Sequence, residues 1–236
     1  MKKQIPNIIT SLNLLSGIIA IMFSFQGDLT AAALMMGLGA FFDFFDGMTA
    51  RLLKVSSEMG KQMDSLADMV SFGVVPGFIM FQLMKSSPNL PDVTIGSLNI
   101  APYAALIIPV LSAFRLAKFN IDTRQTESFI GLPTPANSLF IGSLPFIISG
   151  VWSFHLVELH NYYILLVLSL LLSSLLVAEL PLFALKFKQF IWKGNELRIS
   201  FILISIILLA VLHITAFPII IIIYILLSLF LAHDNF

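Results

Sequence analysis

The chain has 236 residues, of which 58% are hydrophobic and only 11% are charged. Soluble domains carry roughly 25% charged residues, so this composition excludes an ordinary soluble enzyme or binding module and indicates an integral membrane protein. The 13 basic and 13 acidic residues balance, so we expect no nucleic-acid partner, and the absence of cysteine excludes disulfides and thiolate metal ligands.

Long apolar segments predict an all-α fold, a polytopic bundle of transmembrane helices. A helix needs about 20 apolar residues to cross a bilayer, and by this measure the chain has about eight spans. The N-terminus lacks the small-residue cleavage site of a signal peptide, so we expect the first span to be retained. The expected spans are residues 6–25, 30–53, 63–84, 97–117, 136–154, 161–184, 199–214 and 217–233.

The basic residues predict the orientation of these spans. Cytoplasmic loops carry an excess of Lys and Arg. With eight spans, all 13 basic residues except Lys85 fall on one side of the membrane. We therefore expect a multi-pass protein with both termini in the cytoplasm. The residues on the expected cytoplasmic side are Lys2, Lys3, Arg51, Lys54, Lys61, Arg115, Lys118, Arg124, Lys186, Lys188, Lys193 and Arg198.

Four aspartates interrupt the apolar sequence of the second and third spans. Asp43 and Asp46 share one face of the second span, and Asp64 and Asp68 share one face of the third span with Gly60. One charge inside a bilayer costs at least about 2.5–3.5 kcal/mol. Oxygen ligands at this density suit Mg²⁺, Mn²⁺ or Ca²⁺, and four carboxylates balance two such ions. Two metals suit a phosphoryl displacement.

Helix packing and cation transport account less well for the buried acids. A single aspartate can serve helix packing, but four acids in register beside the small residues Gly47 and Ala50 do not suit that role. Cation transporters often show inverted repeats and a site at mid-membrane, whereas this chain has no visible repeat and its acids lie toward the cytoplasm. Glu179 is a further acid within the sixth span, where it either faces the bundle interior and pairs with a basic residue there, or lies near the outer end of a span that is drawn too long.

The aspartates belong to a longer motif, D-x-x-D-G-x-x-A-R, then eight residues, then G-x-x-x-D-x-x-x-D. It resembles the signature of the CDP-alcohol phosphotransferase (CDP-alcohol phosphatidyltransferase class-I) family. The resemblance implies a six-helix catalytic core within residues 1–184, with residues 185–236 adding a basic cytoplasmic loop and two further spans. It also implies a homodimer, and a reaction in which an alcohol displaces CMP from a CDP-linked lipid. The matching residues are Asp43, Asp46, Gly47, Ala50, Arg51, Gly60, Asp64 and Asp68.

The same resemblance implies the roles of individual residues. Two divalent ions, Mg²⁺ or Mn²⁺, would be held by Asp43, Asp46 and Asp64, with Asp68 near the second ion as general base. The start of the first span also resembles these enzymes, and Asn7, Thr10 and Asn13 lie on nearly one face there. These three either bond the nucleotide or the metal ligands, or cap and pack the helix. The expected nucleotide-lipid contacts are Gly47, Ala50, Arg51, Gly60, Asn7 and Thr10.

Three further segments resemble the bacterial and archaeal phosphatidylserine synthase branch of this family. This resemblance implies CDP-diacylglycerol and L-serine as substrates at a membrane-lipid surface, with the site facing the cytoplasm. Arg115 suits the serine carboxylate, and Asn120 and Gly131 suit its other polar groups. The alternative for Arg115 is a helix-end anchor. The segments are residues 71–76, 113–120 and 129–136.

The acceptor alcohol has an alternative within the same chemistry. Glycerol 3-phosphate or an inositol phosphate would also accept a phosphatidyl group. A phosphorylated acceptor would require a cluster of two or more Arg or Lys residues facing the cavity. The sequence therefore predicts serine, with a phosphorylated alcohol as the second choice.

Overall fold

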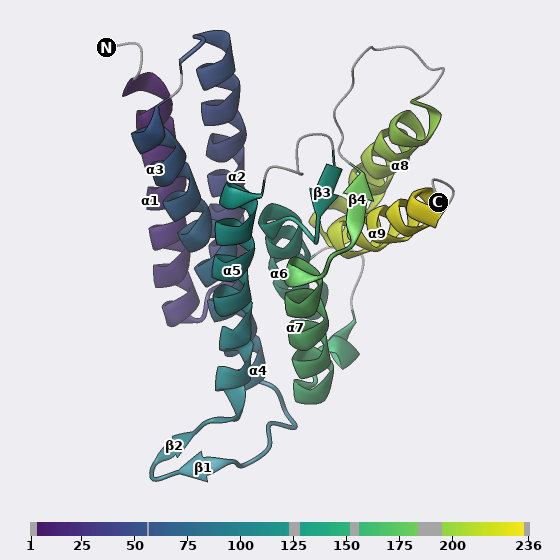
Figure 1. Cartoon of the computed structure of the whole chain (residues 1–236). Helices are drawn as coiled ribbons and strands as arrows, with labels where there is room; N and C mark the ends of the chain where they lie inside the picture. Colours follow the sequence, from purple (N-terminus) through teal and green to yellow (C-terminus); the bar gives the residue numbers. More distant parts are fainter. Residues whose placement is uncertain (1–3, 56, 123–127, 152–155, 184–194, 234–236) are drawn as a thin grey trace.

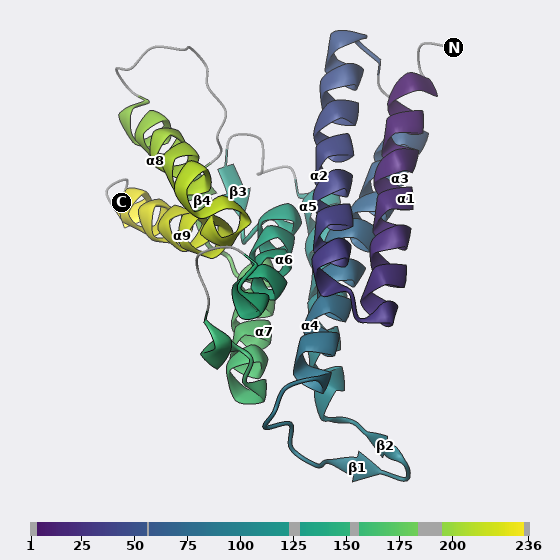
Figure 2. The ribbon, with the colours of Figure 1, turned by 180° about the vertical axis from the view of Figure 1, so that it is seen from behind.

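The computed structural model describes residues 4–55, 57–122, 128–151, 156–183 and 195–233, and it confirms the all-α fold (Figure 1). Long helices stand side by side around an apolar core, and the C-terminal helices lean away from them (Figure 2). The strands in the described part of the chain are short and form two antiparallel pairs. They are β1 (Thr94–Ile95), β2 (Leu98–Asn99), β3 (Ser128–Ile130) and β4 (Pro181–Phe183).

The helices follow the expected spans with shifted ends. Within the described residues, five helical segments are long and apolar enough to cross a membrane, namely residues 4–26, 29–52, 58–85, 101–121 and 196–230. Helices α6 and α7 are shorter, with 16 residues each, so the count of eight spans stays a prediction. The helices are α1 (Gln4–Gln26), α2 (Leu29–Leu52), α3 (Glu58–Asp68), α4 (Val75–Lys85), α5 (Ile107–Ile121), α6 (Thr134–Ser149), α7 (Tyr162–Val177), α8 (Glu196–Leu212) and α9 (Phe217–His233).

Several shorter helical turns connect these elements. A π-helical segment, η1 (Met69–Val74), joins α3 to α4, so that residues 58–85 run as one continuous helix. The 3₁₀ helices are η2 (Ala101–Leu106), η3 (Val157–Leu159) and η4 (His213–Ala216). His213, the first residue of η4, has a φ of 55°. The chain turns there between α8 and α9, and we define these two helices as the C-terminal hairpin (Figures 1 and 2).

The sixth expected span, residues 161–184, is wrong at its C-terminal end. Helix α7 ends at Val177, and Pro181 begins β4 instead of continuing the helix. Proline lacks a backbone N–H and disfavours helical geometry in the residue before it, which accounts for the early end. Glu179 therefore lies beyond the helix, where its carboxylate forms an ion pair of 3.1 Å with Lys118. The sixth span is thus drawn too long, which is one of the two alternatives for Glu179, and its basic partner lies outside the bundle interior because the Glu179 side chain is 70% exposed.

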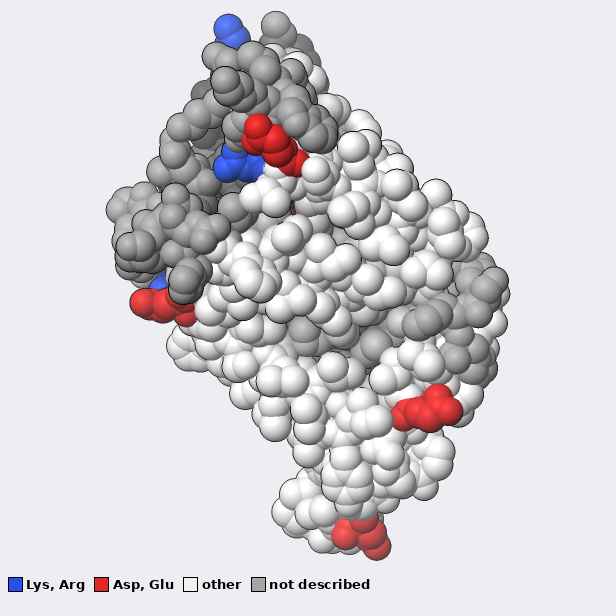
Figure 3. All heavy atoms as spheres, turned by 90° about the vertical axis from the view of Figure 1, so that its right-hand side faces the viewer, with Lys and Arg blue, Asp and Glu red and all other residues white. Residues whose placement is uncertain are grey.

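The outer surface is that of a membrane protein. Ile8, Phe25 and Phe44 are 61%, 63% and 62% exposed, and apolar side chains of this size face outward along most helices. A contiguous apolar surface of this extent is not stable in water and suits lipid. Figure 3 shows a broad central area of one side without charged residues among those described. The basic residues expected at positions 2, 3, 124, 186, 188 and 193 lie outside the described residues.

Small residues let α1 approach the π-helical segment closely. A Cβ atom added at Gly17 would lie 2.5 Å from Ser71 Oγ and 3.1 Å from Ser71 Cα. Ser71 is buried, and its hydroxyl donates to the Asn13 carbonyl over 3.1 Å. This contact holds the N-terminal helix against the helix that carries Asp64 and Asp68.

We predict that Gly17→Ala lowers the melting temperature of the purified protein in detergent. The added methyl group must push α1 away from Ser71, and overpacking of this kind costs about 1–3 kcal/mol. Gly37→Ala is the matched control, because nothing lies within 4 Å of a Cβ atom added there and alanine favours a helix over glycine. Equal melting temperatures for the two variants would contradict the importance of this contact.

Candidate active site

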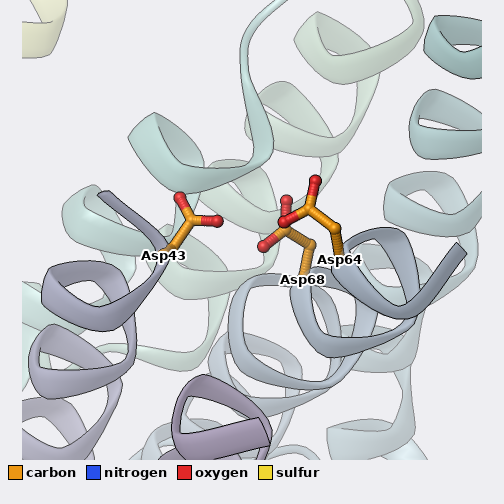
Figure 4. Close-up of side chains that lie close together, drawn as sticks. All are labelled: Asp43, Asp64 and Asp68. Carbon is orange, nitrogen blue, oxygen red and sulfur yellow. The ribbon is translucent and has the colours of Figure 1, made fainter. Parts of the chain in front are cut away.

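Three of the four aspartates form a compact group between α2 and α3. Asp43 on α2 faces Asp64 and Asp68 on α3 (Figure 4), and one carboxylate oxygen of each lies within 4.8 Å of the others. Metal–oxygen distances are about 2.0–2.1 Å for Mg²⁺ and 2.3–2.6 Å for Ca²⁺, so two ligands of one ion lie at most about twice that distance apart. The oxygen-only donors suit a divalent cation, and the limit of 4.8 Å on their spacing lies within the span of Ca²⁺ ligands but exceeds the span of about 4.2 Å for Mg²⁺ ligands, so binding of Mg²⁺ would draw the acids slightly together.

The acids of this group lie close enough to repel one another. One carboxylate oxygen each of Asp43, Asp64 and Asp68 lies within 4.8 Å of the others, and like charges at this spacing destabilise one another unless a proton or a cation lies between them. Asn13, which is fully buried, donates from Nδ2 to Asp68 Oδ1 over 3.4 Å. The group thus requires a proton or a cation between its acids, and Asn13 orients Asp68.

Asp46 has a different environment from the other three acids. Its Oδ2 accepts a hydrogen bond of 2.7 Å from the Thr10 hydroxyl, and it does not belong to the group within 4.8 Å. The expectation that all four carboxylates converge is therefore met by three of them. The charge of Asp46 still interacts with Asp43, Asp64 and Asp68, so it contributes to the same negative field.

A cavity of about 250 Å³ opens beside the acids, between the ends of α1, α2 and α3. It contains five of the six residues expected to contact the nucleotide-lipid, and Arg51 is the exception. Arg51 is exposed and donates from Nε to the Gly47 carbonyl over 3.0 Å. The lining residues are Pro6, Asn7, Thr10, Asp46, Gly47, Ala50, Val55, Ser57, Gly60, Lys61 and Asp64.

The motif glycine of α3 is required by a close approach. Ser57 caps α3, and its Oγ accepts a hydrogen bond of 3.0 Å from the Gly60 N–H. A Cβ atom at Gly60 would lie 3.0 Å from Asn7 Oδ1 and 3.0 Å from Ser57 Oγ. Glycine at this position therefore brings the start of α1 up to the cavity.

Two of the three residues expected to bind serine, Arg115 and Asn120, lie on α5. Arg115 on α5 is 6% exposed, donates from Nε to the Leu132 carbonyl over 3.3 Å, and interacts electrostatically with Asp68. Its guanidinium lies 4.8 Å from the centre of the Phe119 ring. Asn120 donates to the hydroxyl of Ser65, the neighbour of Asp64, over 2.8 Å. Both side chains are thus close to the acids.

Gly131 is placed differently, against the chain segment that follows α7. Its φ is 78°, and its N–H donates to the Leu180 carbonyl over 2.9 Å. A Cβ atom there would lie 2.6 Å from the Leu176 carbonyl oxygen. This N–H is therefore engaged within the protein, and the glycine serves the left-handed backbone and the close packing of the loop.

Residues 3–174 match the family model described as CDP-alcohol phosphatidyltransferase. The chain belongs to the CDP-alcohol phosphatidyltransferase family. It is 36% identical over 142 residues to a CDP-diacylglycerol–serine O-phosphatidyltransferase of Bacillus subtilis, covering 60% of this chain and 75% of that protein. It is 32% identical over 172 residues to an archaetidylserine synthase of Methanothermobacter thermautotrophicus, covering 72% and 67%.

A third relative has a similar sequence identity to this chain. The chain is 33% identical over 138 residues to a CDP-diacylglycerol–serine O-phosphatidyltransferase of Methanocaldococcus jannaschii, covering 58% of each chain. As a member of the CDP-alcohol phosphatidyltransferase family, the protein is a transferase of phospholipid biosynthesis. The matched region includes the acid group and the cavity and leaves the C-terminal hairpin outside it.

Four cavity-lining residues were not among the expected site residues of this CDP-alcohol phosphatidyltransferase, namely Pro6, Val55, Ser57 and Lys61. Lys61 and Ser57 line the cavity, although the sequence pattern marks Lys61 only as a topological charge. Its position directly after the motif glycine, in the first turns of a helix whose start lines the cavity, is the signal that could have identified it. Ser57 carries the signal of an N-cap, which is a structural role.

Proposed function

We propose that the chain transfers the phosphatidyl group of CDP-diacylglycerol to the hydroxyl of L-serine, giving phosphatidylserine and CMP. The observation that carries this proposal is the acid group of Asp43, Asp64 and Asp68, with a motif-lined cavity beside it and the buried Arg115 interacting electrostatically with Asp68. Family membership and the names of the relatives support it. Family membership also argues against a cation transporter.

The donor lipid is proposed to bind with its cytidine diphosphate in the cavity. Asn7, Gly47, Ala50 and Gly60 line that space and leave room for a nucleotide, and the Lys61 ammonium supplies a positive charge for a phosphate. Arg51 lies outside the lining at the end of α2, where its guanidinium is exposed to approaching phosphates. The acyl chains would remain in lipid, beside the exposed apolar side chains of the helices.

The acid group and the neighbouring Asp46 are proposed to hold two divalent cations, Mg²⁺ or Mn²⁺, with Asp43, Asp46, Asp64 and Asp68 as ligands. When bound, such ions neutralise the diphosphate and stabilise the charge that develops on the leaving group. The Thr10 hydroxyl fixes one oxygen of Asp46 and the Asn13 amide fixes one of Asp68. These hydrogen bonds hold the acids in place for ligation.

Asp68 is proposed as the general base. It takes the proton of the serine hydroxyl, the serine oxygen forms a bond to the phosphorus that carries diacylglycerol, and the bond from that phosphorus to the oxygen of CMP breaks, with the electron pair leaving on CMP. Arg115 is proposed to bind the serine carboxylate while the serine hydroxyl faces Asp68. General-base catalysis requires the base to lie within hydrogen-bonding reach of that hydroxyl.

The surroundings of Arg115 favour a carboxylate over a phosphorylated acceptor. A phosphate would require a second cation, but Lys118 on the same helix is paired with Glu179 at 3.1 Å. Of the basic residues in the described helix α5, only Arg115 is buried. A single planar guanidinium suits one carboxylate with bidentate geometry.

The proposal includes a cytoplasmic site and a homodimer. The ends of α2, α3 and α5 nearest the acid group lie at one end of the molecule in Figure 1 and carry Arg51, Lys54, Lys61 and Lys118. Lys85 lies at the far end of α4. The excess of positive charge on cytoplasmic surfaces supports this orientation.

An acceptor assay tests the proposed function. We expect the purified protein with CDP-diacylglycerol and Mn²⁺ or Mg²⁺ to release CMP when L-serine is supplied, and not with glycerol 3-phosphate or an inositol phosphate. A chelator should stop the reaction, and added Mn²⁺ should restore it. CMP release with a phosphorylated acceptor alone, or metal uptake into vesicles without CMP, would overturn the assignment.

A further inference from the structure

Arg115 is held in place by a backbone carbonyl, which makes its position depend on a loop. Its Nε donates to the Leu132 carbonyl over 3.3 Å, and the Leu132 N–H in turn donates to the Leu175 carbonyl at the end of α7 over 2.8 Å. Because Nε is used in this way, the edge with the two terminal nitrogens is the one that remains for a carboxylate. A shift of Leu132 would therefore turn the guanidinium.

The loop that carries Leu132 is itself held by a short β ribbon. Strands β3 and β4 pair with Phe129 opposite Leu182. The pairing continues beyond the strands, because the Gly131 N–H donates to the Leu180 carbonyl over 2.9 Å. Leu132 and Leu182 are each 1% exposed. The β3–β4 ribbon thus joins the loop beside Arg115 to the chain segment after α7.

The C-terminal hairpin contacts this ribbon through Tyr224 on α9. The Tyr224 hydroxyl donates to the Phe183 carbonyl on β4 over 2.9 Å, and its ring packs on Phe183 at 5.0 Å and on Phe201 of α8 at 5.8 Å between ring centres. Tyr224 is 8% exposed. Figure 1 shows the ribbon lying between the hairpin and the helices of the bundle.

We infer that Tyr224 is a positioning residue for the acceptor side of the site: through the β3–β4 ribbon it fixes Leu132, and through Leu132 it fixes the Arg115 guanidinium. The C-terminal hairpin, which lies outside the region that matches the family, thereby contributes to binding of the acceptor alcohol. The identity of that acceptor as serine rests on the proposed function. The hydrogen-bonded path from α9 to Arg115 does not depend on it.

Tyr224→Phe tests this inference, because it removes the hydroxyl and keeps the ring. We expect the KM for L-serine to rise about 3- to 10-fold, the range that loss of one neutral hydrogen bond produces, while the KM for CDP-diacylglycerol changes less than about 2-fold. A general loss of structure would change both constants or the melting temperature, so the split between the two KM values is the informative readout.

Tyr162→Phe is the matched control. Tyr162 is 6% exposed, and its hydroxyl also donates to a backbone carbonyl, that of Ala101, over 3.0 Å. It stands at the start of α7, at the opposite end of that helix from the ribbon (Figure 1). We expect Tyr162→Phe to leave the KM for the acceptor unchanged.

The results of these assays separate this inference from the proposed function. Equal KM values for the two variants, or a parallel rise of both KM values in Tyr224→Phe, would overturn the role of Tyr224. If the wild-type protein does not use serine, the proposed function fails. The two variants are then compared with the acceptor that supports CMP release, and the same selective rise in its KM still decides the role of Tyr224.

Discussion

An Asp68→Asn variant is expected to release CMP at least about 100-fold more slowly than the wild-type protein while still binding CDP-diacylglycerol. An amide does not accept the proton of the attacking hydroxyl, and general-base catalysis contributes about 10²- to 10⁴-fold. Asp43, Asp46 and Asp64 remain to hold cations for the donor lipid. Single-turnover CMP release and retention of labelled CDP-diacylglycerol measure the two effects separately.

Asp28→Asn is the control for this charge change. Asp28 caps α2, and its Oδ1 accepts a hydrogen bond of 3.0 Å from the Ala31 N–H. Asparagine caps a helix about as well as aspartate, and the position lies about 22 Å along α2 from Asp43. This variant should retain normal turnover. A normal rate in Asp68→Asn would show that another group takes the proton.

An Asp43→Asn variant is expected to lose metal and donor-lipid binding together. Asp43 is the one member of the three-acid group that comes from α2, so its loss removes the ligand on one side of the cation. Changes around metal ligands already cost about 10- to 100-fold in affinity, so we expect the Mn²⁺ concentration for half-maximal activity to rise at least about 10-fold. Metal titrations of CMP release and of lipid binding measure this shift.

The comparison between the two variants tests the division of roles. Raised Mn²⁺ should restore part of the activity of Asp43→Asn and none of the activity of Asp68→Asn, because only the first defect is in affinity. An unchanged metal requirement in Asp43→Asn, or an equal and mild loss in both variants, would contradict the assignment of one acid to binding and the other to proton transfer.

The acid group could be predicted from sequence because helices fix the direction of their side chains. Spacings of three and four residues place acids on one face of a helix. Within a bilayer, a segment that is not part of a closed β-barrel must be helical. The convergence of Asp43, Asp64 and Asp68 followed from these rules and the short connection between their helices. The separate environment of Asp46 did not, because it depends on the rotation of α1, which brings the Thr10 hydroxyl to its carboxylate.

The acceptor side was less predictable for a different reason. Strands β3 and β4 have three residues each, too few for a periodic pattern, and they lie far apart in the sequence. Tyr224 reaches Phe183, a residue of another element 41 positions away. Helix α9 is apolar on all sides, so no polar face shows which side packs inward. These contacts arise from tertiary structure alone.

The π-helical segment directly after Asp68 has a consequence for how the chain tolerates change. Six residues of wide turns separate the acids of α3 from the tightly packed α4. π-Helical turns are rare in proteins, but those that do occur are often found at functional sites. They correspond to an extra residue within an α-helix, so removing one residue between Met69 and Val74 would restore ordinary winding. Since each residue turns a helix by about 100°, such a deletion would swing the carboxylates away from α2 without altering a single one of them.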